Sequence, residues 1–75
     1  MQRIIDGLLY DTKTATLLFK EEDTKRQLFM TPNNNYFMLY GTGEIVVKTE
    51  DSVKDYLGRK DVKKYAELFG KPKEA

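Results

Sequence analysis

The side chains that most often carry out chemistry are scarce in this 75-residue sequence. It contains no histidine and no cysteine, and Ser52 is its one serine. Acid-base and nucleophilic catalysis draw mainly on these residue types, or on carboxylates and lysines whose pKa is shifted inside a cleft. The acidic residues here fall in turns and predicted helix starts, and so short a chain has little room for a large pocket. We therefore expect a protein that is not an enzyme, with no catalytic residues, no metal site and no cofactor.

Gly41-Thr42-Gly43 is the one stretch that could be compared with a phosphate-binding loop. It lacks the Gly-x-x-x-x-Gly-Lys pattern and the helix start that would point backbone amides at a phosphate. Glu44 follows it directly, and a carboxylate there would repel an anion. We interpret the stretch as a hairpin turn.

The segment RKDVKK, residues 59–64, holds the densest positive charge. Together with Tyr36 and Tyr40 as stacking platforms, four of its side chains could follow a phosphate backbone: Arg59, Lys60, Lys63 and Lys64. Three carboxylates within helical reach would neutralise part of this charge: Asp55, Asp61 and Glu67. The net charge of the chain is only +1, which gives little general attraction to nucleic acid. We interpret the segment as a solvated helix face and keep a single-stranded nucleic-acid binding module as the alternative function.

Short β-strands separated by turns are predicted for the first fifty residues. RIIDGLLY is expected to be one strand, interrupted or bulged at Asp6-Gly7, because a glycine inside a strand pattern often marks such a defect. DTKT then forms a turn into the strand ATLLFK. This hairpin would place Leu8 opposite Leu17 and Tyr10 opposite Ala15.

The aromatic row YFMLY, residues 36–40, is the predicted interaction surface. We expect TPNNN before it to be an even-length hairpin loop that follows the strand QLFM. Alternation along the strands then places one set of side chains under the helices: Leu17, Phe19, Leu28, Phe37 and Leu39. The opposite face would expose the candidate partner-binding residues: Phe29, Tyr36, Met38 and Tyr40. An exposed apolar face of this kind usually marks a binding surface. The alternatives are tyrosines that pack flat with their hydroxyls in water, or a sheet that curls into a small barrel and buries both faces.

After a last strand, EIVVKT, the pattern changes to that of helices. Thr49 is a predicted N-cap, and Gly58 is expected to end the first helix. A second helix should begin near Lys60 or Asp61 and end at Gly70. The predicted fold class is therefore α+β: a small antiparallel meander of four to five strands, followed by two short C-terminal helices packed on one face. Residues 1–70 would form a single domain and residues 71–75 a flexible tail.

Composition sets limits on size and location. Hydrophobic residues make up 40% of the chain and charged residues 33%, a balance typical of folded globular proteins. A chain of this size buries only about 60% of its unfolded surface, so its core is small and self-association would help stability. The sequence has no apolar run of the roughly 18 residues that a membrane span needs. We expect no signal peptide, because Met1-Gln2-Arg3 leads directly into Ile4-Ile5 without an apolar h-region. We expect a cytoplasmic protein.

Three stretches of the sequence resemble a family of small uncharacterised proteins from phages and mobile elements of Gram-positive bacteria. These are IIDGLLYDTKTATLL, LFMTPNNNYFMLYGTG and IVVKTEDSVKDYLGRKDVKKYAELFG. The chain departs from the family pattern at Glu44, where the family usually has another glycine, and it lacks a loop of variable length that often follows. The resemblance implies an accessory gene of a mobile element, and such genes often encode inhibitors of host defence, including anti-CRISPR and anti-restriction proteins.

These observations together predict a non-catalytic protein-interaction module. It would act by binding and sterically blocking a partner protein, such as a host defence complex, and a homodimer that buries the aromatic face is one form it could take.

Overall fold

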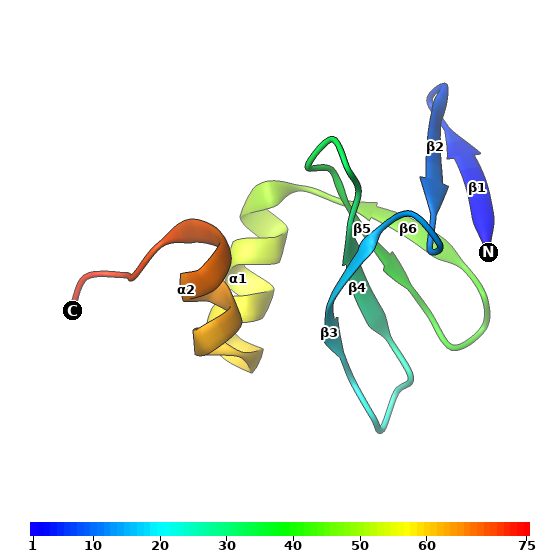
Figure 1. Ribbon diagram of the computed structural model, residues 1–75. Coiled ribbons are helices and arrows are strands. Elements are labelled where there is room, and N and C mark those ends of the chain that lie inside the picture. Colours follow the sequence, from blue (N-terminus) through cyan, green and yellow to red (C-terminus); the bar gives the residue numbers. More distant parts are fainter.

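The strands of the protein form two antiparallel sheets, and two short helices follow them (Figure 1). A computed structural model describes all of residues 1–75. The strands are β1 (Gln2–Ile5), β2 (Leu8–Asp11), β3 (Thr16–Lys20), β4 (Gln27–Met30), β5 (Tyr36–Leu39) and β6 (Ile45–Lys48), and the helices are α1 (Glu50–Lys60) and α2 (Val62–Phe69). Strands β3 to β6 form a four-stranded meander in chain order, and β1 and β2 form a separate hairpin. The predicted α+β class is confirmed.

The first predicted strand is in fact a complete hairpin. Ile5 pairs with Leu8, so Asp6 and Gly7 alone make the turn. Both adopt the left-handed conformation, with φ of 52° and 77°. A two-residue turn of this kind matches the twist of the flanking strands, and Asp-Gly is one of the sequences that favour it. The predicted bulge at Asp6-Gly7 was therefore wrong.

The chain changes sheets between β2 and β3. The backbone amides of Thr14 and Ala15 both donate to the carbonyl of Asp11, at 3.3 and 3.0 Å, and the amide of Lys13 donates to the Asp11 side chain at 2.9 Å. Strand β3 then pairs with β4 and not with β2. The predicted pairings of Leu8 with Leu17 and of Tyr10 with Ala15 were wrong, because the turn at Asp11 leads β3 away from β2 and into the other sheet.

The loop between β4 and β5 has an odd number of residues. Thr31 and Asn35 still pair across the hairpin, with the Thr31 amide donating to the Asn35 carbonyl at 2.7 Å. The three residues between them form the loop, and Asn34 takes the left-handed conformation with φ of 63°. Met30 therefore lies opposite Tyr36, and the predicted even-length connection was wrong. A register change of one residue moves each side chain of a strand to the other face.

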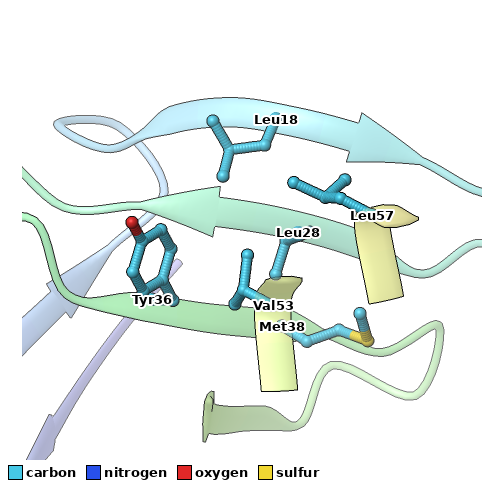
Figure 2. Close-up of a cluster of buried hydrophobic side chains, with 6 residues drawn as sticks. All are labelled: Leu18, Leu28, Tyr36, Met38, Val53 and Leu57. Atoms are coloured by element: carbon cyan, nitrogen blue, oxygen red, sulfur yellow. The ribbon is translucent and has the colours of Figure 1, made fainter. Parts of the chain in front are cut away.

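Two hydrophobic cores lie on opposite faces of the four-stranded sheet. Figure 2 shows the helix-side core, in which strands β3, β4 and β5 meet α1; its buried members are Leu18, Leu28, Tyr36, Met38, Val53 and Leu57. A register shift in β3 lets Leu18 and the neighbouring Phe19 both contribute to this side. The hairpin-side core consists of Tyr10, Phe29, Phe37 and Ile45. The helices and the β1–β2 hairpin thus cover the sheet from its two sides (Figure 1).

The two helices share one capping residue. Helix α1 begins as predicted, with the Thr49 hydroxyl accepting a hydrogen bond from the Ser52 amide at 3.1 Å. It continues through Gly58, so the predicted end at Gly58 was wrong. Asp61 closes α1 through its own amide, which donates to the Leu57 carbonyl, and it caps α2 through its carboxylate, which accepts from the Lys64 amide. The predicted stop of α2 at Gly70 is confirmed.

Candidate protein-interaction surface

The predicted partner-binding residues are not on an exposed face. Tyr36 and Met38 are buried in the helix-side core, and Tyr40 is half-buried against it. Phe29 is buried on the other face, where its ring stacks on Phe37 with the centroids 5.1 Å apart. The expectation of an exposed aromatic face was wrong for two reasons. The odd-length loop turned Tyr36, Met38 and Tyr40 toward the helices, and the hairpin covers the face that carries Phe29.

The four cations of the alternative site are divided between two helices. Arg59 in α1 forms an ion pair with Asp55 at 3.1 Å, and Lys64 in α2 forms one with Glu67 at 3.2 Å. Lys60 and Lys63 are exposed. The arrangement of Arg59 and Lys64 is that of an ordinary solvated helix face, where carboxylates one turn away offset the lysines and arginines.

Three of the exposed apolar side chains of the protein lie on the β1–β2 hairpin. Tyr10 and Ile5 pack toward the hairpin-side core. Because side chains alternate along a strand, Ile4 and Leu9 point the other way, and these two residues are cross-strand partners. Ile4 is 71% exposed and Leu9 is 54% exposed, and Leu8 near the turn is also exposed. None of the three belongs to either core.

Apolar side chains also remain open on the sheet beside the hairpin. Leu17, Phe29, Phe37 and Val47 form one row across the four strands. The two middle residues are buried, and the ring of Tyr10 packs edge-on against Phe37 with the centroids 5.6 Å apart. The residues at the two ends of the row, Leu17 and Val47, are exposed. A hairpin two strands wide thus covers the centre of a face four strands wide. We call Ile4 and Leu9, on the outer face of the hairpin, the hairpin surface.

Specific hydrogen bonds fix the hairpin in place. The Arg3 guanidinium donates to the carbonyl of Ile45 in β6 at 3.0 Å, across 42 residues of sequence. Within the hairpin, the side-chain amide of Gln2 donates a hydrogen bond to the Asp11 carboxylate at 3.0 Å. The hydrogen bond from Gln2, and then the one from the Lys13 amide, hold the pKa of Asp11 below its ordinary value of 3.8. A surface that is already ordered loses less entropy when it binds a partner.

One polar pair joins α1 to the chain after β3. The Tyr56 hydroxyl donates to the carboxylate of Glu21, which also accepts from the Thr24 hydroxyl at 2.8 Å. The hydrogen bond from Tyr56 is the main cause that lowers the pKa of Glu21, whereas burial raises the pKa of Tyr56. Both shifts move these pKa values away from neutrality, which is the opposite of what acid-base catalysis needs. The pair connects α1 with the segment that follows β3.

Comparisons of the chain with protein-family models, with curated protein sequences and with solved structures find no match. Neither helix has the length and apolar character needed to cross a membrane.

Sequence reasoning missed the hairpin surface, although a signal for it was present. Asp6-Gly7 between two apolar runs is a strong local indication of a hairpin. Once that turn is placed, alternation predicts Ile4 and Leu9 on one face and Tyr10 on the other. The long-range contact of Arg3 with Ile45 has no comparable signal in the sequence.

Proposed function

We propose that this protein is a non-catalytic interaction module that binds a protein partner through the hairpin surface. The main observation behind the proposal is that Ile4 and Leu9, which pair across the hairpin, are both exposed. The hydrogen bond from Arg3 to Ile45 holds this hairpin against the sheet. Complete burial of one Leu or Ile side chain contributes about 1.5–3 kcal/mol, so this pair can supply a substantial part of a binding free energy.

The outer face of the hairpin indicates what kind of partner surface fits it. Its polar side chains, Gln2 and Asp11, are hydrogen-bonded to each other. An apolar, uncharged partner surface could therefore cover Ile4 and Leu9 without breaking this hydrogen bond, while the unpaired Oε1 of Gln2, which is exposed, stays in water. A protein surface of this kind is the partner that we propose.

The mechanism is steric: the rigid hairpin occupies a surface that the partner needs for its own function. A host defence complex in the cytoplasm, blocked in the manner of an anti-CRISPR or anti-restriction protein, is the partner that the family resemblance implies. That part of the proposal depends on the resemblance alone.

The test replaces the exposed pair and leaves the fold intact. In Ile4→Glu/Leu9→Lys, opposite charges face each other across the strands, so stability should change by no more than about 0.5 kcal/mol. The matched control is Val62→Glu, which removes an equally exposed apolar side chain from α2, away from the hairpin. Tagged forms of all three proteins are used to capture partners from a lysate of Gram-positive bacteria, and light scattering measures their oligomeric state.

A partner held by the wild type and by Val62→Glu but lost by the double variant supports the proposal. If the double variant keeps each partner, the hairpin surface is not the binding site and the proposal fails. A wild-type dimer that becomes a monomer only in the double variant would show that the surface binds a second copy, which would overturn the assignment to a different protein.

A further inference from the structure

Asp6-Gly7, at the tip of the hairpin, is the one place in the chain where an acidic residue is followed by glycine. The backbone amide nitrogen that follows an aspartate can attack the side-chain carboxyl carbon and close a succinimide ring. Glycine favours this reaction, because it has no Cβ to shield its nitrogen and its backbone rotates freely. The space around Gly7 is open, since a Cβ added there would meet nothing within 4 Å. This pair therefore offers the least hindered ring closure in the chain.

Both reacting groups of the pair are free. Asp6 and Gly7 are exposed. The Asp6 carboxylate takes part in none of the ion pairs and in none of the hydrogen bonds that hold other aspartates. The Gly7 amide donates no backbone hydrogen bond. No contact within the protein thus has to be broken at the carboxyl carbon or at the nitrogen that attacks it.

The other aspartates are restrained by their contacts. Most of them use their carboxylates in hydrogen bonds or ion pairs: Asp11, Asp23, Asp55 and Asp61. Asp51 lies in α1, where the amide that follows it, that of Ser52, donates to the Thr49 hydroxyl. These contacts oppose the backbone rotation that ring closure requires.

The turn itself lies where the hairpin opens most easily. Ile5 and Leu8 are the last residues to pair, and Figure 1 shows the turn projecting beyond the four-stranded sheet. Asp6 has a φ of 52°, a conformation that is unfavourable for a residue with a Cβ. Rotation about Asp6 leaves this conformation and brings its carboxyl carbon to the Gly7 nitrogen. Local opening of a loop tip needs much less free energy than global unfolding.

We propose that Asp6 is a site of spontaneous isoaspartate formation. The Gly7 nitrogen bonds to the carboxyl carbon of Asp6, its proton passes to solvent, and one carboxyl oxygen leaves as water. Water then adds to the main-chain carbonyl carbon of Asp6 and breaks its bond to the Gly7 nitrogen. The chain now runs through the side chain of Asp6, and the old main-chain carbonyl has become a free carboxylate. One water is released and one is taken up, so no other reactant is needed.

Isoaspartate changes the hairpin because it adds one atom to the backbone of the turn. A two-residue turn fits the pairing of Ile5 with Leu8 only at its normal length. The longer turn disrupts the pairing of Ile4 with Leu9, which presents the hairpin surface. Asp6 thereby limits the lifetime of this surface, and this consequence for partner binding rests on the proposed function.

The test ages the full-length protein at neutral pH and physiological temperature. Trypsin cuts after Arg3 and Lys13 and releases one peptide that contains both Asp6 and Asp11. The isoaspartate form of this peptide has an unchanged mass but elutes separately, and an isoaspartate-specific methyltransferase labels it. Fragmentation in the mass spectrometer assigns the position. We expect isoaspartate to accumulate at Asp6 at least tenfold faster than at Asp11 or any other aspartate.

Two variants keep the turn and change only its chemistry, because Asn-Gly and Gly-Gly also suit a turn of this type. Asp6→Asn forms the same ring with ammonia as the leaving group, so it should reach isoaspartate sooner than the wild type. Asp6→Gly has no carboxyl group and cannot react. Nuclear magnetic resonance follows the backbone amides of Ile4 and Leu9. The aged wild type should lose their native signals in proportion to its isoaspartate content, and aged Asp6→Gly should keep them.

These readouts need no partner, so a failure of the proposed function would leave them unaffected. Isoaspartate that forms at Asp6 no faster than at Asp51 would overturn the proposed site. A modified protein that keeps the native amide signals of Ile4 and Leu9 would overturn the effect on the hairpin. Aged and fresh wild type that capture a partner equally well would reject the limit on the lifetime of the hairpin surface, while the binding role of that surface would stand.

Discussion

The hydroxyl of Tyr56 in α1 donates a hydrogen bond to the carboxylate of Glu21, which follows directly after β3. Thirty-five residues separate the two in sequence. Tyr56 also packs edge-on against Phe19 at the end of β3, with the ring centroids 5.9 Å apart. The helix is therefore attached to the edge strand of the sheet by one apolar and one polar contact from the same side chain.

Tyr56→Phe should destabilise the fold by about 1–2 kcal/mol. The variant keeps the ring against Phe19 but removes the hydrogen bond to a charged, buried acceptor, which is costly to leave unpaired. Chemical denaturation measures the change. The control is Tyr65→Phe, since Tyr65 packs in the same core but its hydroxyl makes no hydrogen bond within the protein. Equal losses in both variants would show that the Glu21 contact adds nothing.

Stability should fall as the pH drops below about 4.5. The pKa values of Glu21 and Asp11 are both lowered in the folded protein from ordinary values of 4.5 and 3.8. The unfolded chain therefore takes up protons first, so the contribution of each group is present above its ordinary pKa and is lost as the pH falls through its folded pKa. Melting temperatures between pH 7 and pH 2.5 test this.

The variant Glu21→Gln measures how much of the loss of stability at acid pH is due to Glu21. The amide cannot titrate, so the melting temperature of the variant should fall less steeply over the acid range than that of the wild type. Asp23→Asn is the control, because Asp23 is an exposed acid in the same link. An identical slope in Glu21→Gln and the wild type would assign the acid sensitivity to Asp11 and other groups.

Met38→Ala and Val47→Ala should differ strongly, although the two residues lie on adjacent strands. Met38 is 4% exposed and fills the helix-side core, so we expect a loss of about 2–4 kcal/mol from the cavity left behind. Val47 is 41% exposed at the end of its row on the sheet, and its truncation should cost less than about 1 kcal/mol. Denaturant unfolding gives both values. A larger loss of stability in Val47→Ala than in Met38→Ala would mean that Val47 is in the core and Met38 is exposed, contrary to the structure.

The direction in which the side chains of β5 point is a feature that the sequence could not predict. The α+β class, the Thr49 cap and the stop at Gly70 follow from local signals and agree with the structure. Which face of β5 points toward the helices depends on whether the Thr31–Asn35 loop has an odd or even number of residues, and both choices suit Pro and Asn. The contacts of Glu21 with Tyr56 and of Arg3 with Ile45 join distant segments, so only the folded chain brings them together.

Two glycine-to-alanine substitutions should change stability in opposite directions. Gly7 forms the hairpin turn with φ of 77°, a conformation that costs a residue with a Cβ about 1–2 kcal/mol. Gly58 lies within α1, where an added Cβ meets nothing within 4 Å, and alanine is favoured there by about 1 kcal/mol. Gly7→Ala should therefore destabilise the protein and Gly58→Ala should stabilise it, as measured by denaturant unfolding.

The pair also tests the link between the turn and binding. Strain at Gly7 acts on the strands that present Ile4 and Leu9, so Gly7→Ala should weaken capture of a partner that depends on the hairpin surface. Gly58→Ala leaves those strands unchanged and should bind as the wild type does. A Gly7→Ala protein that is less stable but captures the partner with undiminished affinity would separate the turn from recognition, because the hairpin would then keep its binding geometry despite the strain.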